Sequence, residues 1–137
     1  VMRDLLALTH IVTPNQSECL ALTGIDPVDE ATASSASIKL HDMGPETVII
    51  KMGGDGAFYS SGGQTGMVPG FVVNTVDTVG AGDCFNAGLA VALHGGQPLK
   101  DAVRFACATG ALSTTNNGAA EAAPRLADVL SLIEGNA

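Results

Sequence analysis

The stretch VDTVGAGDCF, residues 76–85, leads into an apolar segment with helical spacing and carries the residues best suited to chemistry. A helix N-terminus holds roughly half a positive charge and several unpaired N–H groups, so it binds anions when side chains do not crowd it. Gly80, Ala81 and Gly82 remove that crowding. The pattern predicts an anion site. The alternative is a structural turn, because glycine turns into helices are common.

Asp83 narrows the chemistry of this predicted anion site. The helix dipole favours a carboxylate in the first turn, which is the structural interpretation. A docked phosphate would compete with that carboxylate, so the pair makes sense when the carboxylate takes a proton beside the phosphate. Phosphoryl transfer needs such a base together with fixed N–H donors around the transferred group. No GxxxxGK[ST] motif occurs, and a GxGxxG motif from Gly80 would require glycine where Phe85 stands.

Composition bounds the kind of protein. The chain has 137 residues, 46% of them apolar, which is enough for the core of one domain. The formal net charge of -8 argues against a nucleic-acid surface or an anionic membrane as partner. Cys19, Cys84 and Cys107 form no CxxC pair and fit a reducing, cytoplasmic setting. No run of about 18 apolar residues is present to span a bilayer.

Hydrophobic spacing and turn residues predict an α/β layered domain that positions this chemistry. Asn15 is a natural N-cap with Glu18 as its capping-box partner, and Gly24 closes that helix. Capping and turn residues together with apolar spacing predict helices over residues 2–9, 16–23, 29–43, 81–94, 99–115 and 125–134. Strands are predicted over 10–13 and 46–52, a hairpin over 57–60 and 65–68, and a further extended stretch over 69–77.

Four segments together resemble the signatures of one enzyme family. DTVGAGD at 77–83 resembles the DTxGAGD signature of the ribokinase-like carbohydrate kinases, also called the PfkB family. TPNQSE at 13–18 is similar to the family's NxxE motif, KMGGDG at 51–56 to its strand-to-turn nucleotide segment, and VPGF at 68–71 to the loop before the signature. The resemblance covers nearly the whole chain. It implies a ribokinase-like layered α/β/α sheet, of which only the C-terminal portion is present.

The resemblance implies an ATP-dependent kinase that acts on a sugar or sugar-like alcohol. Asp83 would deprotonate the acceptor hydroxyl, and Gly80–Gly82 would form the anion hole. Glu18 and Asn15 would place Mg²⁺ and phosphates through water, and the structural alternative for this pair is a plain capping box. The implied nucleotide-binding residues are Asn15, Lys51, Gly53, Gly54, Gly56 and Cys107. Their structural alternatives are a solvent-reaching lysine, turn glycines and a small buried cysteine.

The family resemblance also implies a site for a monovalent cation such as K⁺ beside the anion hole. Members of the family bind such a cation mostly through main-chain carbonyls. By position, these would belong to Asp77, Val79, Ser113, Asn116 and Gly118. Relatives often add a side-chain hydroxyl, and Ala122 stands at the matching place here.

The family's sugar-recognition motifs and lid strands precede the NxxE motif, and this chain has almost nothing before it. We expect residues 1–137 to form a single nucleotide-binding and catalytic portion that is inactive alone, because nothing orients the sugar. An open sheet edge is expected to cause homo-oligomerisation or association with the absent N-terminal part. Two other functions stay open: a vitamin-precursor or nucleoside kinase of the same superfold, and a non-catalytic nucleotide-binding or oligomerising module.

Overall fold

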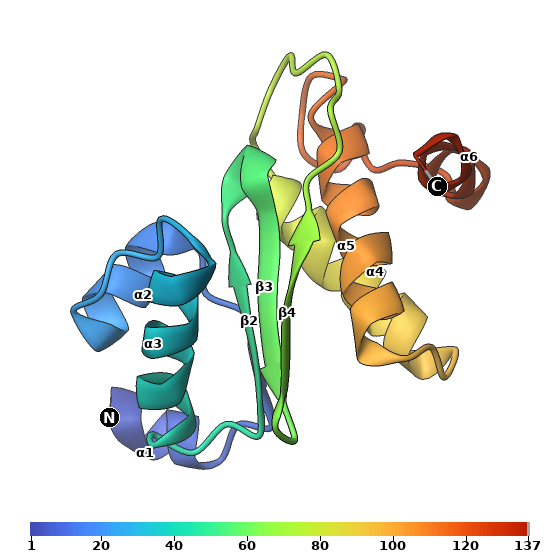
Figure 1. Ribbon diagram of the computed structural model, residues 1–137. Coiled ribbons are helices and arrows are strands. Elements are labelled where there is room, and N and C mark those ends of the chain that lie inside the picture. The colour runs from blue at the N-terminus through green and yellow to red at the C-terminus, as the bar shows by residue number, and fades with distance from the viewer. Residues whose placement is uncertain (137) are drawn as a thin grey trace. The chain divides into compact units, whose positions relative to one another are not determined.

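The computed structural model describes residues 1–136 and divides into two compact units, one over Val1–Met67 and one that begins at Val68. The first unit contains a β-sheet with the helices α1 to α3, and the second contains the helices α4 to α6 (Figure 1). No helix among residues 1–136 is both long and apolar enough to cross a membrane.

The sheet has the strand order β1–β2–β3–β4. Its strands are β1 (Ile11–Val12), β2 (Thr47–Lys51), β3 (Gly56–Ser61) and β4 (Gln64–Pro69). β1 pairs in parallel with β2, and β3 runs antiparallel to β2. Val48, Ile49 and Ile50 of β2 are fully buried. The sequence pattern of a strand covered on both faces is therefore confirmed.

The other elements of the first unit are α1 (Met2–Ala7), α2 (Gln16–Thr23), α3 (Glu30–His41) and the 3-10 turn η1 (Gly53–Asp55). The capping box is confirmed: Asn15 Oδ1 accepts the Glu18 N–H, and the Glu18 carboxylate accepts the Asn15 N–H, both at 2.8 Å. Gly24 ends α2 with φ 73°. This cap fixes the chain directly after β1.

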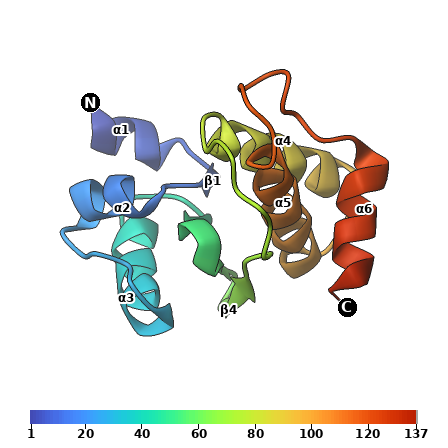
Figure 2. The same cartoon turned by 90° about the horizontal axis from the view of Figure 1, so that it is seen from above.

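Apolar side chains from α2, α3 and the sheet form the core of the first unit. Small residues on α3 let that helix approach the strands closely, and α2 lies beside α3 (Figure 2). The fully or nearly fully buried members are Cys19, Ala33, Ala36, Leu40, Val48, Ile50, Met52 and Phe58.

The second unit is built from α4 (Ala81–His94), α5 (Leu99–Ser113) and α6 (Leu126–Gly135). The short turn at 95–98 joins α4 and α5 as a helical hairpin. The two helices pack closely because one of the contacting residues is a glycine. A Cβ at Gly88 would lie 2.7 Å from Thr109 Oγ1 and 3.3 Å from Ala106 Cα.

The predicted elements agree with the structure within one or two residues at each end, except after the hairpin. The stretch predicted to be extended over residues 69–77 adds no strand to the sheet, since β4 ends at Pro69 and residues 70–80 form no regular element. This irregular segment is anchored mainly by side chains and by the loop after α5, as described below.

Candidate active site

The segment that enters α4 leaves main-chain donors free. Gly80 is the N-cap with φ 79°, and no side chain caps the helix. Among residues 1–136, the N–H groups of Gly80, Gly82 and Asp83 have no acceptor, whereas the Ala81 N–H donates to Thr78 O at 3.2 Å. The sequence predicted free donors at residues 80–82. The free donors in the structure are those of Gly80, Gly82 and Asp83.

The Asp83 carboxylate is exposed in the first turn of α4. It makes no hydrogen bond and no ion pair with another described residue. The carboxylate is therefore available to accept a proton from a ligand that the neighbouring N–H donors bind at the helix start.

The Asp77 carboxylate joins two loops of the second unit. Its Oδ1 accepts the Val79 N–H at 3.0 Å, and its Oδ2 accepts the N–H of Gly118, 41 residues further along the chain, at 3.1 Å. The N–H groups of Val76 and Asp77 both donate to Thr114 O, at 2.7 and 3.0 Å. The hydrogen bonds from Val79 and then Gly118 lower the pKa of Asp77 from its usual value. The ionised carboxylate thus fastens the loop before α4 to the loop after α5.

The lack of a side chain at Gly80 is required where these two loops meet. Its φ of 79° lies in the left-handed region, and a Cβ there would lie 3.0 Å from Ala119 Cβ and 3.2 Å from Ala119 Cα. Glycine at this position therefore serves both the backbone turn and the close approach of the two loops.

The residues predicted to hold a monovalent cation lie in these two loops or at the end of α5. Asp77 and Gly118 are joined by a hydrogen bond. Ser113 is buried, and its Oγ donates to Gly110 O at 2.7 Å. Val79 and Asn116 are exposed. Ala122, which is buried, brings no side-chain oxygen.

In the first unit, predicted nucleotide-binding residues gather where β1 and β2 end. Lys51 is the last residue of β2, its N–H donates to Pro14 O at 2.8 Å, and it forms a parallel bridge with Asn15. Parallel strands present their carboxyl ends at one edge, where α/β folds bind ligands. In η1, which follows, the N–H groups of Gly53 and Gly54 have no acceptor among the described residues, and both glycines are exposed.

Glu18 fits the indirect role predicted for it toward Mg²⁺. One carboxylate oxygen accepts the Asn15 N–H, and the other has no partner among residues 1–136. The part of the chain that the structure describes holds no group of three or more His, Cys, Asp or Glu side chains that could bind a metal ion. Mg²⁺ commonly keeps its waters and binds one or two carboxylates plus substrate phosphates, which suits a single half-engaged carboxylate.

Cys107 lies inside the second unit rather than at its surface. Only 8% of the residue is exposed, and burial raises the pKa of its thiol to about 12. This placement accords with the packing interpretation of Cys107. Its nucleotide contact stays a prediction.

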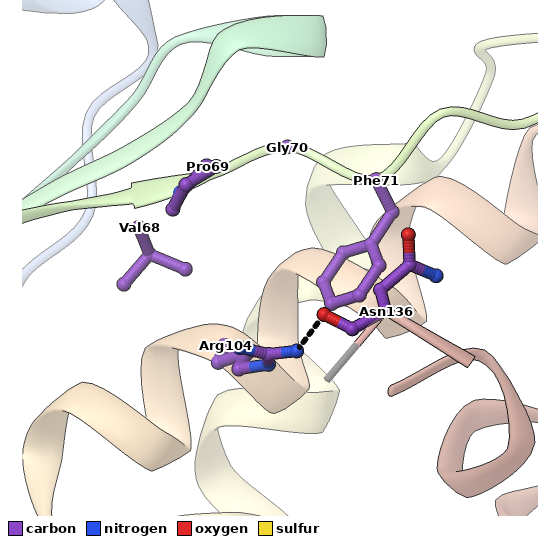
Figure 3. Close-up of a pocket in the computed structure, with 6 residues that line it drawn as sticks. All are labelled: Val68, Pro69, Gly70, Phe71, Arg104 and Asn136. Atoms are coloured by element: carbon purple, nitrogen blue, oxygen red, sulfur yellow. Dashed lines mark hydrogen bonds between the residues drawn. The ribbon is translucent and has the colours of Figure 1, made fainter. Parts of the chain in front are cut away.

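A hollow in the second unit was not found by sequence reasoning. Its volume is about 160 Å³, and it is lined by Val68, Pro69, Gly70, Phe71, Arg104 and Asn136 (Figure 3). The VPGF segment resembles a family loop, but Arg104, which lines the hollow with it, lies within α5 and carries no sequence signal of its own.

Comparison with known proteins places this geometry in a family. Residues 1–126 match the sequence profile described as "pfkB family carbohydrate kinase". The chain belongs to this family. Ribokinase of Haemophilus influenzae is 40% identical over 131 residues, which cover 96% of this chain and 43% of the relative. Pseudouridine kinase of Escherichia coli is 35% identical and covers 97% of this chain and 43% of the relative. The chain thus spans less than half the length of these pfkB-family relatives.

Solved structures described as ribokinases share the fold. Arabidopsis thaliana ribokinase, solved with ribose and ATP, has a TM-score of 0.89 and 32% identity, covering 96% of this chain and 43% of that one. A putative ribokinase II from E. coli, solved with ATP and Mg²⁺, has a TM-score of 0.85 and 31% identity, covering 98% of this chain and 42% of that one. The predicted ribokinase-like α/β fold class is therefore confirmed.

Proposed function

We propose that this chain is the nucleotide-binding and catalytic portion of an ATP-dependent kinase that phosphorylates a hydroxyl of a sugar or sugar-like substrate. One observation carries the proposal: the N–H donors of Gly80, Gly82 and Asp83, which have no acceptor among residues 1–136, adjoin the exposed carboxylate of Asp83, which has no partner there either. Membership of the pfkB family supports it, as do similar structures solved with ribose and ATP, or with ATP and Mg²⁺.

Asp83 is the proposed general base. Its carboxylate takes the proton of the attacking substrate hydroxyl, which becomes a better nucleophile as its O–H bond breaks. The N–H groups of Gly80, Gly82 and Asp83 donate to the oxygens of the transferred phosphoryl group, where negative charge must be stabilised. Ala81, whose own N–H is engaged, completes the anion hole with a side chain small enough to leave it open.

The nucleotide side of the proposal is assigned to residues of the first unit, and the nucleotide contact of Cys107, in the second unit, stays a prediction from the family resemblance. Asn15 and Lys51 are neighbours at the carboxyl ends of β1 and β2, and the N–H groups of Gly53 and Gly54 have no acceptor in the described part of the chain. Gly56, with φ 105°, closes this turn. We assign these residues to binding the nucleotide. Glu18 would help to hold Mg²⁺ through water, and the ion would supply positive charge to the phosphates.

A monovalent cation such as K⁺ is proposed for the paired loops of the second unit. Asp77 and Gly118 are already held together there, and Val79, Ser113 and Asn116 lie in or next to the same loops. The buried Ala122 provides no hydroxyl ligand, so such a cation would depend on main-chain oxygens. Activity that rises with KCl and not with choline chloride at equal ionic strength would support this assignment.

The proposal requires a sugar-binding part beyond these residues. We infer that residues 1–137 alone turn over little substrate, and that they associate with such a part or with a second copy. Mixing the chain with Mg·ATP and a sugar panel checks this: nucleotide binding without turnover is expected. If no saturable nucleotide binding is seen up to roughly millimolar concentration, a usual upper range for KM, a non-catalytic module would be favoured.

Replacing Asp83 tests the mechanism in the full-length protein. Asp83→Asn is expected to lower kcat by about 10²–10⁴-fold with a smaller change in KM for ATP, because a general base acts on the chemical step. Asp101→Asn is the matched control, since Asp101 is also an exposed aspartate in the first turn of a helix in the same unit. Equal small effects in both variants would remove Asp83 from the mechanism.

A nucleoside is the second candidate acceptor, favoured by the 35% identity with pseudouridine kinase. Both acceptors present a ribose-like ring with a primary hydroxyl to the same base. Comparing kcat/KM for ribose, fructose and pseudouridine in the full-length protein separates them, because discrimination is a ratio of these constants.

A further inference from the structure

Arg104 is a half-buried cation with an unusual set of partners. It lies in α5, and no carboxylate among residues 1–136 forms an ion pair with it. Its Nε is buried and has no hydrogen-bond acceptor in the described part of the chain. A guanidinium stays charged in proteins, so other groups must compensate this charge.

The first compensation comes from the end of α6. Arg104 Nη2 donates to Asn136 O at 2.9 Å (Figure 3). The same nitrogen also donates to Ile133 O at 3.4 Å. Carbonyl oxygens at a helix C-terminus carry partial negative charge and lack partners within the helix, so a cation there is favourable. Arg104 therefore fastens α6 to α5.

The second compensation comes from Phe71, in the irregular segment that leads to α4. The Arg104 Cζ atom lies 5.6 Å from the centre of the Phe71 ring, within the range of a cation–π contact. Between the end of β4 at Pro69 and Thr75, the main chain of this segment makes no hydrogen bond to the described residues. The Phe71 ring is thus its anchor upstream of the bonds at Thr114.

We infer that Arg104 is a positioning residue for the anion hole: it clamps Phe71 against the end of α6 and so fixes the segment that delivers Gly80 and Asp83. The inference rests on the proposed function for its catalytic consequence, but the clamp itself is independent of it. Downstream of Phe71 the same segment is held by the Asp77 and Thr114 bonds, so the clamp and these bonds hold its two ends.

Hydrogen–deuterium exchange in the full-length protein tests the clamp without any activity measurement. Arg104→Met and Phe71→Leu are each expected to raise exchange of the hydrogen-bonded amides of Val76, Asp77 and Val79 by roughly three- to thirtyfold, the range for losing a partly desolvated cation–π contact. Amides of α4 and α5 should stay protected, which shows that the fold persists. Phe71→Tyr keeps the ring face and should restore the wild-type rate. Lys100→Met, which removes an exposed cation one turn earlier on α5, is the control.

Kinetics test the positioning role. Arg104→Met and Phe71→Leu should lower kcat by about tenfold with little change in KM for ATP, because misplaced donors weaken transition-state stabilisation. Unchanged exchange at Val76, Asp77 and Val79 in both variants, or a change in Arg104→Met confined to α6, would overturn the clamp. Faster exchange with unchanged kcat would overturn the positioning role. A wild-type protein without kinase activity would refute the proposed function and leave the exchange result to decide the clamp.

Discussion

At the scale of single residues, the site combines main-chain N–H donors with the Asp83 carboxylate, all without hydrogen-bond partners among residues 1–136. The residue types around Asp83 indicated this arrangement, since glycine and alanine leave a helix start uncovered. They could not indicate which amide would be engaged. The Ala81 N–H is engaged because the turn brings Thr78 O within 3.2 Å of it, and such a turn depends on the φ of Gly80 and on the loop around Ala119.

The cysteines offer a prediction that depends on burial. Burial raises the pKa of Cys107 to about 12, so its thiol stays protonated at pH 8, whereas Cys84 is only half-buried. Brief treatment of the native protein with iodoacetamide should therefore modify Cys84 and spare Cys107, because the thiolate is the reactive form. Peptide mass spectrometry reads the result. Full modification of Cys107 after unfolding is the control, and equal native reactivity of the two would contradict it.

Asp77 predicts a particular dependence of stability on pH. Its folded pKa is lowered, so its contribution is present above the unfolded value, near 3.8, and is lost as the pH falls through the folded value. Asp77→Asn should lower Tm at pH 7, because an amide nitrogen cannot accept the second N–H. This difference in Tm between Asp77→Asn and the wild type should shrink as the pH falls below the pKa of the Asp77 carboxyl in the unfolded chain. A deficit that stayed constant down to strong acid would show that the carboxylate charge is not involved.

At the scale of elements, local signals predicted most of the fold. The caps at Asn15 and Gly24 and the apolar spacing of the later helices are encoded within a few residues. The stretch 69–77 was predicted to be extended because it is rich in β-branched and aromatic residues. That composition reports how well a segment fits a sheet, and pairing needs a neighbouring strand. The segment instead follows the contact of Phe71 with Arg104, which no local pattern reveals.

The close contact of α4 with α5 gives a stability prediction. A Cβ at Gly88 would lie 2.7 Å from Thr109 Oγ1, so Gly88→Ala should force the helices apart and lower the free energy of unfolding by about 1–3 kcal/mol. Gly95→Ala is the matched control. Its φ is -73°, and its new Cβ would be no closer than 3.5 Å to another atom. Gly95→Ala should be neutral or stabilising by about 0.4–1 kcal/mol. Urea unfolding measures both, and equal effects would refute the packing argument.

At the scale of the whole molecule, the open edge of the sheet is the feature that sequence reasoning anticipated. β1 has only two residues and lies at the edge of the sheet. Apolar side chains on and near α1 are exposed, namely Met2, Leu5, Leu8 and Ile11. The sequence could indicate this exposed patch, because a short edge strand and nearby apolar residues are local features, and it could not indicate which surface would bury the patch.

This patch predicts how residues 1–137 behave in isolation. Size-exclusion chromatography with light scattering should show mass rising with concentration from roughly micromolar toward millimolar, because exposed apolar surface favours association. Leu5→Lys combined with Leu8→Lys should weaken the association. Leu126→Lys, at an exposed leucine of the second unit, should leave it unchanged. A strictly monomeric chain at every concentration would end this prediction.

The bond from Asp77 to Gly118 has a practical consequence for anyone who modifies the protein. The turns at 114–122 look like a harmless surface site for an epitope tag, a fluorophore or a permuted terminus. They are in fact tied by one carboxylate to the segment that starts α4. An insertion there would disturb the Asp77–Gly118 hydrogen bond and so the position of Gly80. The exposed hairpin tip at Gly62 and Gly63, in the other unit, is the safer place for a label.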